Sequence, residues 1–143
     1  MSVVDINNLI KTYTSGDVAV KALRGVSVSI NEGEFVSIMG ASGSGKSTMM
    51  NIIGCLDRPT SGVYTLLSRN VGVLNRRELA FIRNNHIGFV FQSFNLIPRT
   101  TALENVELPL HYQHKVPSAS AKKMALEALE KVGLKQRVHH LPN

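Results

Sequence analysis

The feature that most constrains the fold is a glycine-rich octet, Gly40-Ala41-Ser42-Gly43-Ser44-Gly45-Lys46-Ser47. The preceding residues 35–39 are nearly all apolar, which predicts a strand buried on both faces of a parallel sheet. The following residues 46–53 favour a helix. A buried strand before the octet and a helix after it are the surroundings that the phosphate-binding pattern G-x-x-x-x-G-K-[ST] requires. The order of these elements predicts an α/β domain.

The residue types explain how such a loop binds phosphate. Its glycines permit positive φ and let the backbone approach a ligand with no Cβ in the way. The backbone N–H groups from Gly43 to Ser47 can then point at phosphate oxygens, where the helix N-terminus adds about half a positive charge. Lys46 supplies a cation for the β and γ phosphates, and the Ser47 hydroxyl is placed to bind Mg²⁺. The alternative, a merely flexible turn, leaves this combination of residues unexplained.

Local signals predict the remaining elements of the first half of the chain. Alternating apolar residues predict a strand at 23–30, and a short strand is expected at 63–67. Asn75 is placed to cap a helix at 75–83, with Leu79 and Ile82 on its apolar side. The apolar run at 86–91 predicts a second buried strand.

The second half of the chain is predicted to be helical. Thr101 can cap a helix that starts at Ala102 and that Pro109 ends or kinks. A longer helix is expected at 118–132, with Gly133 at the position of a C-terminal cap. Its predicted apolar stripe consists of Ala121, Met124, Ala125, Ala128, Leu129 and Val132. We therefore predict a nucleotide-binding α/β core at 1–92 and the start of an α-helical subdomain at 93–143.

Composition excludes several classes of protein. The formal net charge of +6 suits a phosphate-rich partner, but the lysines and arginines are scattered, which is typical of solvated faces. No basic stripe with interleaved aromatic residues indicates nucleic-acid binding. A single cysteine, Cys55, excludes an internal disulfide and is expected to be a small buried apolar residue. No secretory signal and no run of ~18 apolar residues is present, so we expect a cytoplasmic location.

Three further strings are more specific than the glycine loop: the turn Pro59-Thr60-Ser61-Gly62, HIGFVFQSFNLIP at 86–98, and TALENVELPL at 101–110. On these strings the chain resembles the ATPase subunits of ABC transporters, especially the branch serving macrolide export and lipoprotein release. The resemblance runs from Val4 to the last residue. It implies a P-loop NTPase-like sheet domain with N-terminal antiparallel strands, leading into an α-helical subdomain. ATP and Mg²⁺ are the cofactors that it implies.

The resemblance also assigns roles to matching residues. Tyr13 matches the aromatic residue that stacks on adenine, and Thr48 would contact the α-phosphate. Gln92 matches the glutamine that reaches Mg²⁺ and the attacking water, so Lys46 and Gln92 are the predicted catalytic residues. Residues 93–106 resemble the surface that meets a membrane permease. The predicted nucleotide-binding residues are Tyr13, Gly40, Ser42, Gly43, Ser44, Gly45, Lys46, Ser47 and Thr48, with Ser47 and Gln92 as the metal ligands.

The chain lacks several elements with which the family pattern continues. The LSGGQ-type signature loop, the apolar strand ending in Asp-Glu and the switch histidine have no counterpart, and residues 139–143 resemble the run just before the signature loop. We expect the apolar flanks of 35–39 and 87–91 to be exposed without those elements. The chain as given is expected to bind ATP weakly at best, with negligible turnover. A piece of a longer product and a gene shortened by a stop codon or frameshift are both open explanations.

Two other functions remain as alternatives. One is a nucleotide-binding or permease-binding module that does not hydrolyse ATP. The other is a small-molecule kinase, which is disfavoured because those kinases usually open with the glycine loop, whereas 39 residues precede it here. The partners implied by the resemblance are a membrane permease and a second nucleotide-binding domain in a homodimer, and no nucleic acid. Through the permease, the protein would be peripheral to the inner face of the cell membrane.

Overall fold

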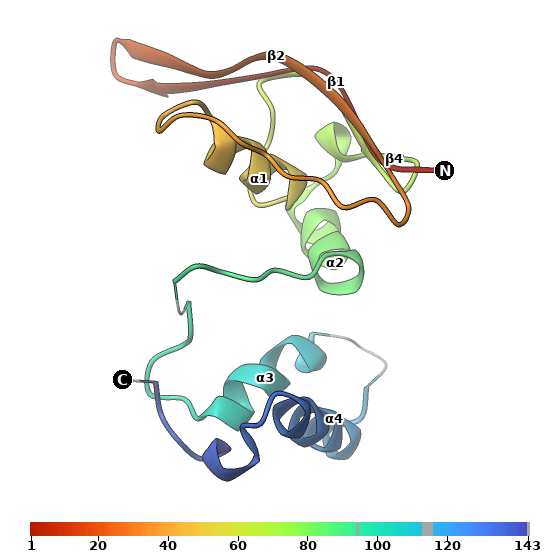
Figure 1. The fold of residues 1–143 in the computed structure, drawn as a ribbon, viewed down its shortest axis with the longest axis vertical. Helices are drawn as coiled ribbons and strands as arrows, with labels where there is room; N and C mark the ends of the chain where they lie inside the picture. Colours follow the sequence, from red (N-terminus) through yellow and green to blue (C-terminus); the bar gives the residue numbers. More distant parts are fainter. Residues whose placement is uncertain (94, 113–115, 143) are drawn as a thin grey trace. The chain divides into compact units, whose positions relative to one another are not determined.

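The structure, a computed structural model, describes residues 1–93, 95–112 and 116–142. It divides into two compact units, Met1–Ile87 and Gly88–Asn143, each of which is described by itself (Figure 1). Phe94, in the predicted permease-facing surface, and Asn143, in the run that resembles the segment before the signature loop, lie outside the described residues. The assignment of 1–92 and 93–143 to the family's two subdomains stays a prediction.

The first unit contains four strands: β1 (Ser2–Ser15), β2 (Val18–Asn31), β3 (Ser61–Leu66) and β4 (Arg69–Asn70). β1 and β2 form an antiparallel hairpin around the two-residue turn Gly16-Asp17, whose residue types favour such turns. β3 pairs antiparallel with the other edge of β1, which gives the strand order β2-β1-β3-β4. The predicted fold class, α/β with N-terminal antiparallel strands, is confirmed.

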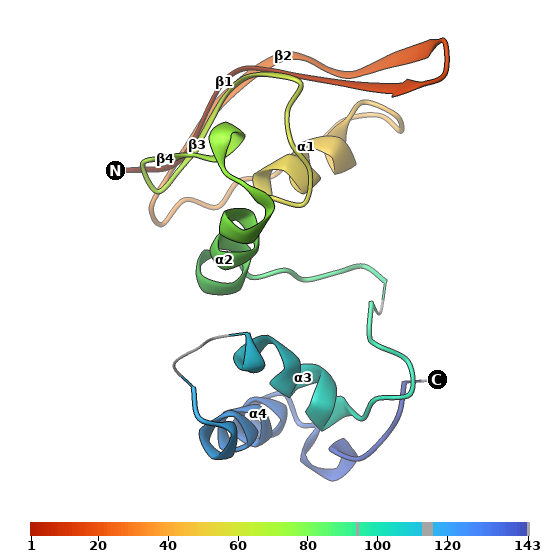
Figure 2. The same ribbon diagram turned by 180° about the vertical axis from the view of Figure 1, so that it is seen from behind.

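Two helices and a 3-10 turn complete this unit: α1 (Lys46–Ile53), η1 (Val71–Val73) and α2 (Arg76–His86). Both ribbon views show α1 and α2 on the same side of the strands (Figures 1 and 2). The core joins apolar side chains from the strands, the two helices and η1: Val4, Ile6, Leu9, Leu23, Met49, Ile52, Cys55, Tyr64, Leu66, Val71, Leu79 and Ile82. Burial of a large apolar side chain contributes about 1.5–3 kcal/mol, so this cluster fixes α1 against the sheet.

Tyr64 lies at the centre of the core and is fully buried. Its hydroxyl donates a hydrogen bond to the carbonyl oxygen of Ile53 at 2.7 Å, at the end of α1. Burial, with a smaller contribution from Cys55, raises the pKa of Tyr64, so the hydroxyl remains a donor. Burial likewise raises the pKa of the Cys55 thiol. The expectation that Cys55 is a buried apolar residue is confirmed.

The cap predicted for α2 is confirmed. The side chain of Asn75 accepts hydrogen bonds from the N–H groups of Arg77 and Glu78, and the Glu78 carboxylate accepts one from the N–H of Asn75. This reciprocal arrangement satisfies N–H groups that the first helical turn leaves without partners. Leu79 and Ile82 are buried, as predicted. The helix ends at His86 and not at Arg83, so His86 does not start a strand.

The two buried strands predicted at 35–39 and 86–91 are wrong. Residues 35–39, which come after β2, and residues 87–91, which come after α2, run as irregular backbone. Phe35 is 99% exposed. A strand needs neighbours to satisfy its backbone N–H and C=O groups, and the sheet of the described residues stops at β2 and β4. The expected exposure of these apolar flanks is confirmed by Phe35, Met39, Val90 and Phe91.

The second unit contains α3 (Ala102–His111), α4 (Ser118–Lys131) and the 3-10 turn η2 (Lys135–Arg137). Thr101 caps α3 through a reciprocal pair of hydrogen bonds with Glu104, as predicted. The helix does not end at Pro109, which lies inside it near the C-terminal end. Leu103 of α3 packs against Ala125 and Leu129 of α4, and these three side chains form a small core.

The apolar stripe predicted for α4 is too wide. Ala121, Ala125 and Leu129 are buried at a spacing of four residues, but Met124 and Val132 are exposed. One neighbouring helix covers a single row of side chains, so residues on the flanks of a helical stripe stay in contact with solvent. Gly133 has a φ of 75° and follows the helix, and the N–H of Leu134 closes the end by donating to the carbonyl of Leu129 at 2.8 Å. The predicted C-terminal cap is confirmed.

Candidate nucleotide-binding site

The glycine loop lies directly against β2. A Cβ added at Gly45 would lie 2.5 Å from the carbonyl oxygen of Ala22, and the φ of Gly45 is 94°. Only glycine combines this backbone conformation with so close an approach. Within the loop, a Cβ on Gly40 would lie 2.6 Å from the hydroxyl of Ser44. The absence of side chains at these positions shapes a cradle of backbone, which fits a phosphate group.

The loop ends at the N-terminus of α1, whose N-cap residue is Gly45. No side chain caps this helix, in contrast to the capping boxes of α2 and α3. The first-turn N–H groups of a helix have no partner within the helix, and they carry the positive end of its dipole. Ser47 is exposed and Thr48 is partly buried in this first turn. The start of α1 therefore provides hydrogen-bond donors for an anion.

Lys46 bends back across the loop. Its Nζ donates hydrogen bonds to the carbonyl oxygens of Gly40 at 2.8 Å and Ala41 at 2.7 Å. The ammonium group is thereby held at the loop and not extended into solvent. Hydrogen bonds between an ammonium group and phosphate are stronger than those to a neutral carbonyl, so a phosphate at the loop would compete for this cation.

A hollow of about 320 Å³ adjoins the loop on the side of β2, and sequence reasoning missed it. Lys21 and Arg24 line it together with Gly43 and Ser44. Two additional cations beside the loop raise the local positive potential and favour an anion there. Neither residue belongs to a motif. Lys21 and Arg24 lie beside the loop because β2 pairs with β1 and packs on the loop.

Tyr13 lies on β1, where Val20 is its cross-strand partner, and Tyr13 is 42% exposed. Lys21 and Ala22 follow Val20 on β2, and they line the hollow beside the loop. Tyr13 therefore lies on the strand next to β2, and β2 is the strand on which the glycine loop packs. The sequence-predicted residues Tyr13, Lys46, Ser47 and Thr48 all belong to the first unit, together with the loop glycines.

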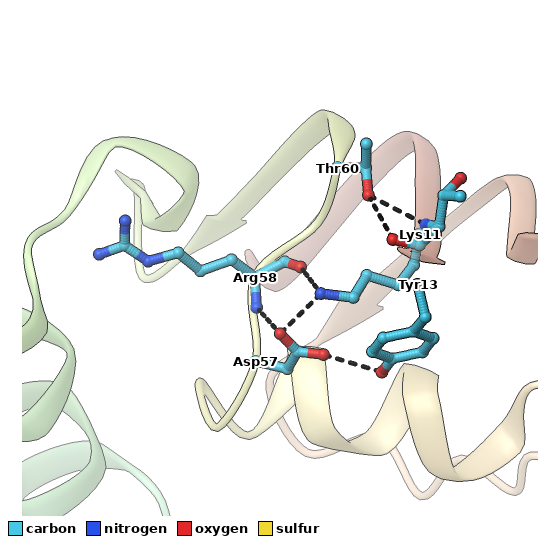
Figure 3. A network of polar contacts seen from close by, with 6 residues as sticks. Lys11, Tyr13, Asp57, Arg58 and Thr60 are labelled. Carbon is cyan, nitrogen blue, oxygen red and sulfur yellow. Dashed lines mark hydrogen bonds and ion pairs between the residues drawn. The ribbon is translucent and has the colours of Figure 1, made fainter. Parts of the chain in front are cut away.

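A network of polar contacts holds the Tyr13 side chain (Figure 3). The Tyr13 hydroxyl donates to Oδ2 of Asp57 at 2.8 Å, and the Nζ of Lys11 donates to Oδ1 of Asp57 at 2.7 Å. The Nζ of Lys11 also lies over the Tyr13 ring, 4.7 Å from its centroid, and donates to the carbonyl oxygen of Arg58. Sequence reasoning placed Asp57 in a loop and missed this contact. The spacing of Lys11 and Tyr13, two residues apart on one strand, predicts that their side chains are neighbours, but no local signal points to Asp57.

Opposing effects set the ionisation of Asp57. Partial burial alone would raise its pKa, but hydrogen bonds from Lys11, Tyr13 and the N–H of Arg58, with the charge of Lys11, outweigh burial. The pKa of Asp57 is therefore below its ordinary value, and the carboxylate is ionised near neutral pH. An ionised carboxylate accepts from Tyr13 and Lys11 at once.

Gln92 belongs to the second unit, where its side chain is exposed outside any helix or strand. Its predicted role toward Mg²⁺ and the attacking water therefore stays a prediction. The acidic residues that follow it along the chain are occupied elsewhere. Glu104 caps α3, and hydrogen bonds from the N–H and hydroxyl of Thr101 lower its pKa.

A glycine loop that packs on a β-sheet and opens a helix with uncapped N–H groups defines a P-loop nucleotide-binding domain of the α/β class. The comparison with known families is specific. A family model described as ABC transporter matches residues 23–143, and the chain belongs to this family.

Curated relatives agree with the family assignment. The chain is 54% identical over 141 residues to an uncharacterized ABC transporter ATP-binding protein of Thermotoga maritima, which covers 99% of this chain and 60% of the relative. It is 50% identical to the macrolide export ATP-binding/permease protein MacB of Brucella abortus, over 98% of this chain and 22% of that protein. The chain thus spans 60% or less of the length of these two relatives.

A solved structure has the same fold. The ATP-binding cassette MJ0796, in a dimeric post-hydrolysis state bound to ADP and Pi, matches with a TM-score of 0.88 and 50% identity. The match covers 98% of this chain and 62% of that chain. The corresponding sequence comes from Methanocaldococcus jannaschii. Within the part of this chain that the structure describes, no helix is both long and apolar enough to cross a bilayer.

Proposed function

We propose that residues 1–143 form the triphosphate-gripping part of an ABC transporter ATPase subunit, which couples ATP binding and hydrolysis to export through a membrane permease. The observation that carries the proposal is the glycine cradle at the uncapped start of α1, where a Cβ at Gly45 would meet the backbone of β2. Lys46, Lys21 and Arg24 concentrate positive charge around this cradle. The phosphates of a nucleoside triphosphate carry the negative charge that such a cradle at a helix N-terminus favours.

The residues take separate roles toward Mg-ATP. The N–H groups from Gly43 to Ser47 would hold the phosphate oxygens, Lys46 would neutralise the β and γ phosphates, and Thr48 would contact the α-phosphate. Ser47 would hold Mg²⁺, and it fits because it is exposed in the first turn of α1. The role of Gln92 toward Mg²⁺ is carried over from the family resemblance alone. When bound, Mg²⁺ would supply positive charge that neutralises the phosphates. Tyr13 would stack on the adenine.

The relatives support the proposed partners. MacB of Brucella abortus is an ATP-binding/permease protein, and the protein PvdT of Pseudomonas fluorescens is a pyoverdine export ATP-binding/permease protein. The matching cassette structure is dimeric. We propose that residues 93–106 face a permease, that the nucleotide-binding domains pair as a homodimer, and that the protein lies at the inner face of the membrane.

The second candidate function is a module that binds nucleotide or permease without hydrolysis. The glutamates after Gln92 favour this second candidate for these 143 residues, because each already has a hydrogen-bond or ion-pair partner. The pairs are Glu104 with Thr101, Glu107 with His111, Glu127 with Lys123 and Glu130 with Lys135. A general base must be free to accept a proton and needs a pKa near the working pH. The pKa of Glu104 is lowered, so it lies further from neutral pH than the pKa of an ordinary glutamate. We therefore expect turnover by the chain as given to be negligible.

Calorimetric titration with Mg-ATP, alongside a phosphate-release assay, tests both candidates. Binding that is lost in Lys46→Ala and retained in Lys122→Ala, an exposed cation on α4, would support the proposed site. Phosphate release at rates typical of transport ATPases, abolished by Lys46→Ala, would refute the module without hydrolysis. Absence of Mg-ATP binding by the folded wild-type chain would refute the nucleotide site itself.

A further inference from the structure

The Asp57 carboxylate joins two side chains of β1. Its Oδ2 accepts from the Tyr13 hydroxyl and its Oδ1 accepts from the Nζ of Lys11, so each oxygen is used by a different residue (Figure 3). Lys11 and Asp57 are 13% and 29% exposed, which makes this pair less hydrated than an ordinary surface ion pair. Asp57 therefore restrains Tyr13 directly and Lys11 beside it.

Asp57 is itself held in place by the loop that carries it. The N–H of Arg58 donates to Oδ1 of Asp57 at 2.7 Å, which fixes the carboxylate at the start of the loop. Further along, the N–H of Thr60 donates to the carbonyl of Ile10 at 2.8 Å, and the hydroxyl of Thr60 accepts from the N–H of Thr12 at 2.9 Å. These contacts attach the loop to β1 on both sides of Lys11. The carboxylate is thus a fixed point against which Tyr13 is oriented.

Two restraints act on the Tyr13 ring. The hydrogen bond to Asp57 fixes the hydroxyl end, and the ammonium of Lys11 lies over the ring at 4.7 Å from its centroid. A cation at this distance is attracted to the ring face. Tyr13 is 42% exposed, so part of the residue remains open to a ligand. The network therefore holds the Tyr13 ring in a fixed orientation on β1. The neighbouring strand, β2, is the one on which the glycine loop packs.

We propose that Asp57 is a positioning residue for nucleotide recognition: through its hydrogen bond to the Tyr13 hydroxyl, it holds the ring in the orientation on which the adenine stacks. The inference rests on the proposed function, in which Tyr13 contacts the base. Pre-organisation of a contact side chain removes an ordering cost from binding. Loss of the Asp57 contact therefore weakens the binding of ligands that carry a base and leaves the binding of triphosphate alone unchanged.

A purely structural role makes a different prediction. If Asp57 only attaches its loop to Lys11 of β1, its replacement weakens every ligand of the first unit alike, because α1 and the glycine loop pack on the same sheet. Mg-tripolyphosphate is the probe that separates the roles, since it offers the phosphates of ATP without ribose or base. The ratio of ATP affinity to tripolyphosphate affinity reports on positioning of Tyr13 and is insensitive to a uniform loss of folded protein.

The experiment measures dissociation constants of Mg-ATP and Mg-tripolyphosphate for the full chain by calorimetry. Asp57→Asn and Tyr13→Phe are each expected to weaken ATP binding about two- to tenfold, the range for a net hydrogen bond, with tripolyphosphate changed less than twofold. In a Tyr13→Ala background, Asp57→Asn should have no further effect on ATP. Asp5→Asn, at an exposed position on the same strand, is the control for the change in charge and should leave both affinities unchanged.

The outcomes separate this inference from the proposed function. Equal weakening of both ligands by Asp57→Asn, or weakening of ATP that persists in the Tyr13→Ala background, would overturn the positioning role. If Tyr13→Ala weakens ATP binding and Asp57→Asn does not, the positioning role fails while the base contact stands. If Tyr13→Ala leaves ATP affinity unchanged, the base contact fails and the positioning role fails with it.

Discussion

Replacement of Gly45 by alanine tests the claim that the glycine loop is shaped by its contact with β2. The added Cβ would lie 2.5 Å from the carbonyl oxygen of Ala22 and 3.0 Å from the side chain of Leu23. The φ of 94° costs an L-residue about 1–2 kcal/mol. The contact with a backbone atom forces a shift that adds about 1–3 kcal/mol, as overpacking does in a core. The free energy of unfolding is expected to fall by about 2–5 kcal/mol, the sum of these effects.

Gly33→Ala is the matched control for this substitution. Gly33 follows β2 with a φ of 79°, and a Cβ there would meet nothing within 4 Å. It incurs the conformational cost of about 1–2 kcal/mol without the steric one. Urea unfolding followed by far-UV circular dichroism gives both values, and Mg-ATP titration of the folded variants gives the affinity. A loss of stability in Gly45→Ala no larger than in Gly33→Ala would refute the close packing of the loop on β2.

Two further predictions follow from polar contacts. Asp57 has a pKa lowered from its ordinary 3.8, so its stabilising contribution is complete above that value and disappears as the pH falls through its folded-state pKa. The difference in urea midpoint between the wild type and Asp57→Asn should thus be constant from pH 7 to 5 and shrink below about pH 4; a constant difference down to pH 2 would contradict the lowered pKa. Thr101→Ala removes the cap of α3 and should destabilise the second unit by about 1 kcal/mol, measured by amide hydrogen exchange in α3. Ser120→Ala, at an exposed position on α4, is the comparison for loss of a hydroxyl in the same unit, and equal protection in Thr101→Ala and the wild type would refute the capping role.

The sequence predicted the elements that local chemistry determines. The hydrogen bonds that cap α2 and α3 join residues three positions apart, so Asn75 and Thr101 revealed both helix starts. The glycine loop and α1 were recognisable for the same reason, because eight consecutive residues carry the pattern. The antiparallel strands at the N-terminus came from the family resemblance and are confirmed.

The elements that depend on distant partners were not predictable from the chain alone. Residues 35–39 have the composition of a buried strand, yet a strand forms only where another segment satisfies its backbone. Met124 lies in the right helical phase, but the helix that packs on α4 leaves it exposed. The contact between Tyr13 and Asp57 joins residues 44 positions apart, and no local pattern announces it. The cations Lys21 and Arg24 reach the loop only through the packing of β2.

The most direct test of the central claim is to observe the backbone amides of the glycine loop during titration with Mg-ATP. In amide-resolved nuclear magnetic resonance, the account predicts saturable shifts of the N–H signals from Gly43 to Ser47, all reporting one dissociation constant. The same titration on Lys46→Ala should shift these signals little at matched ligand concentrations. Shifts confined to other parts of the chain, with the loop amides unchanged at saturation, would contradict the proposal that this loop holds the triphosphate.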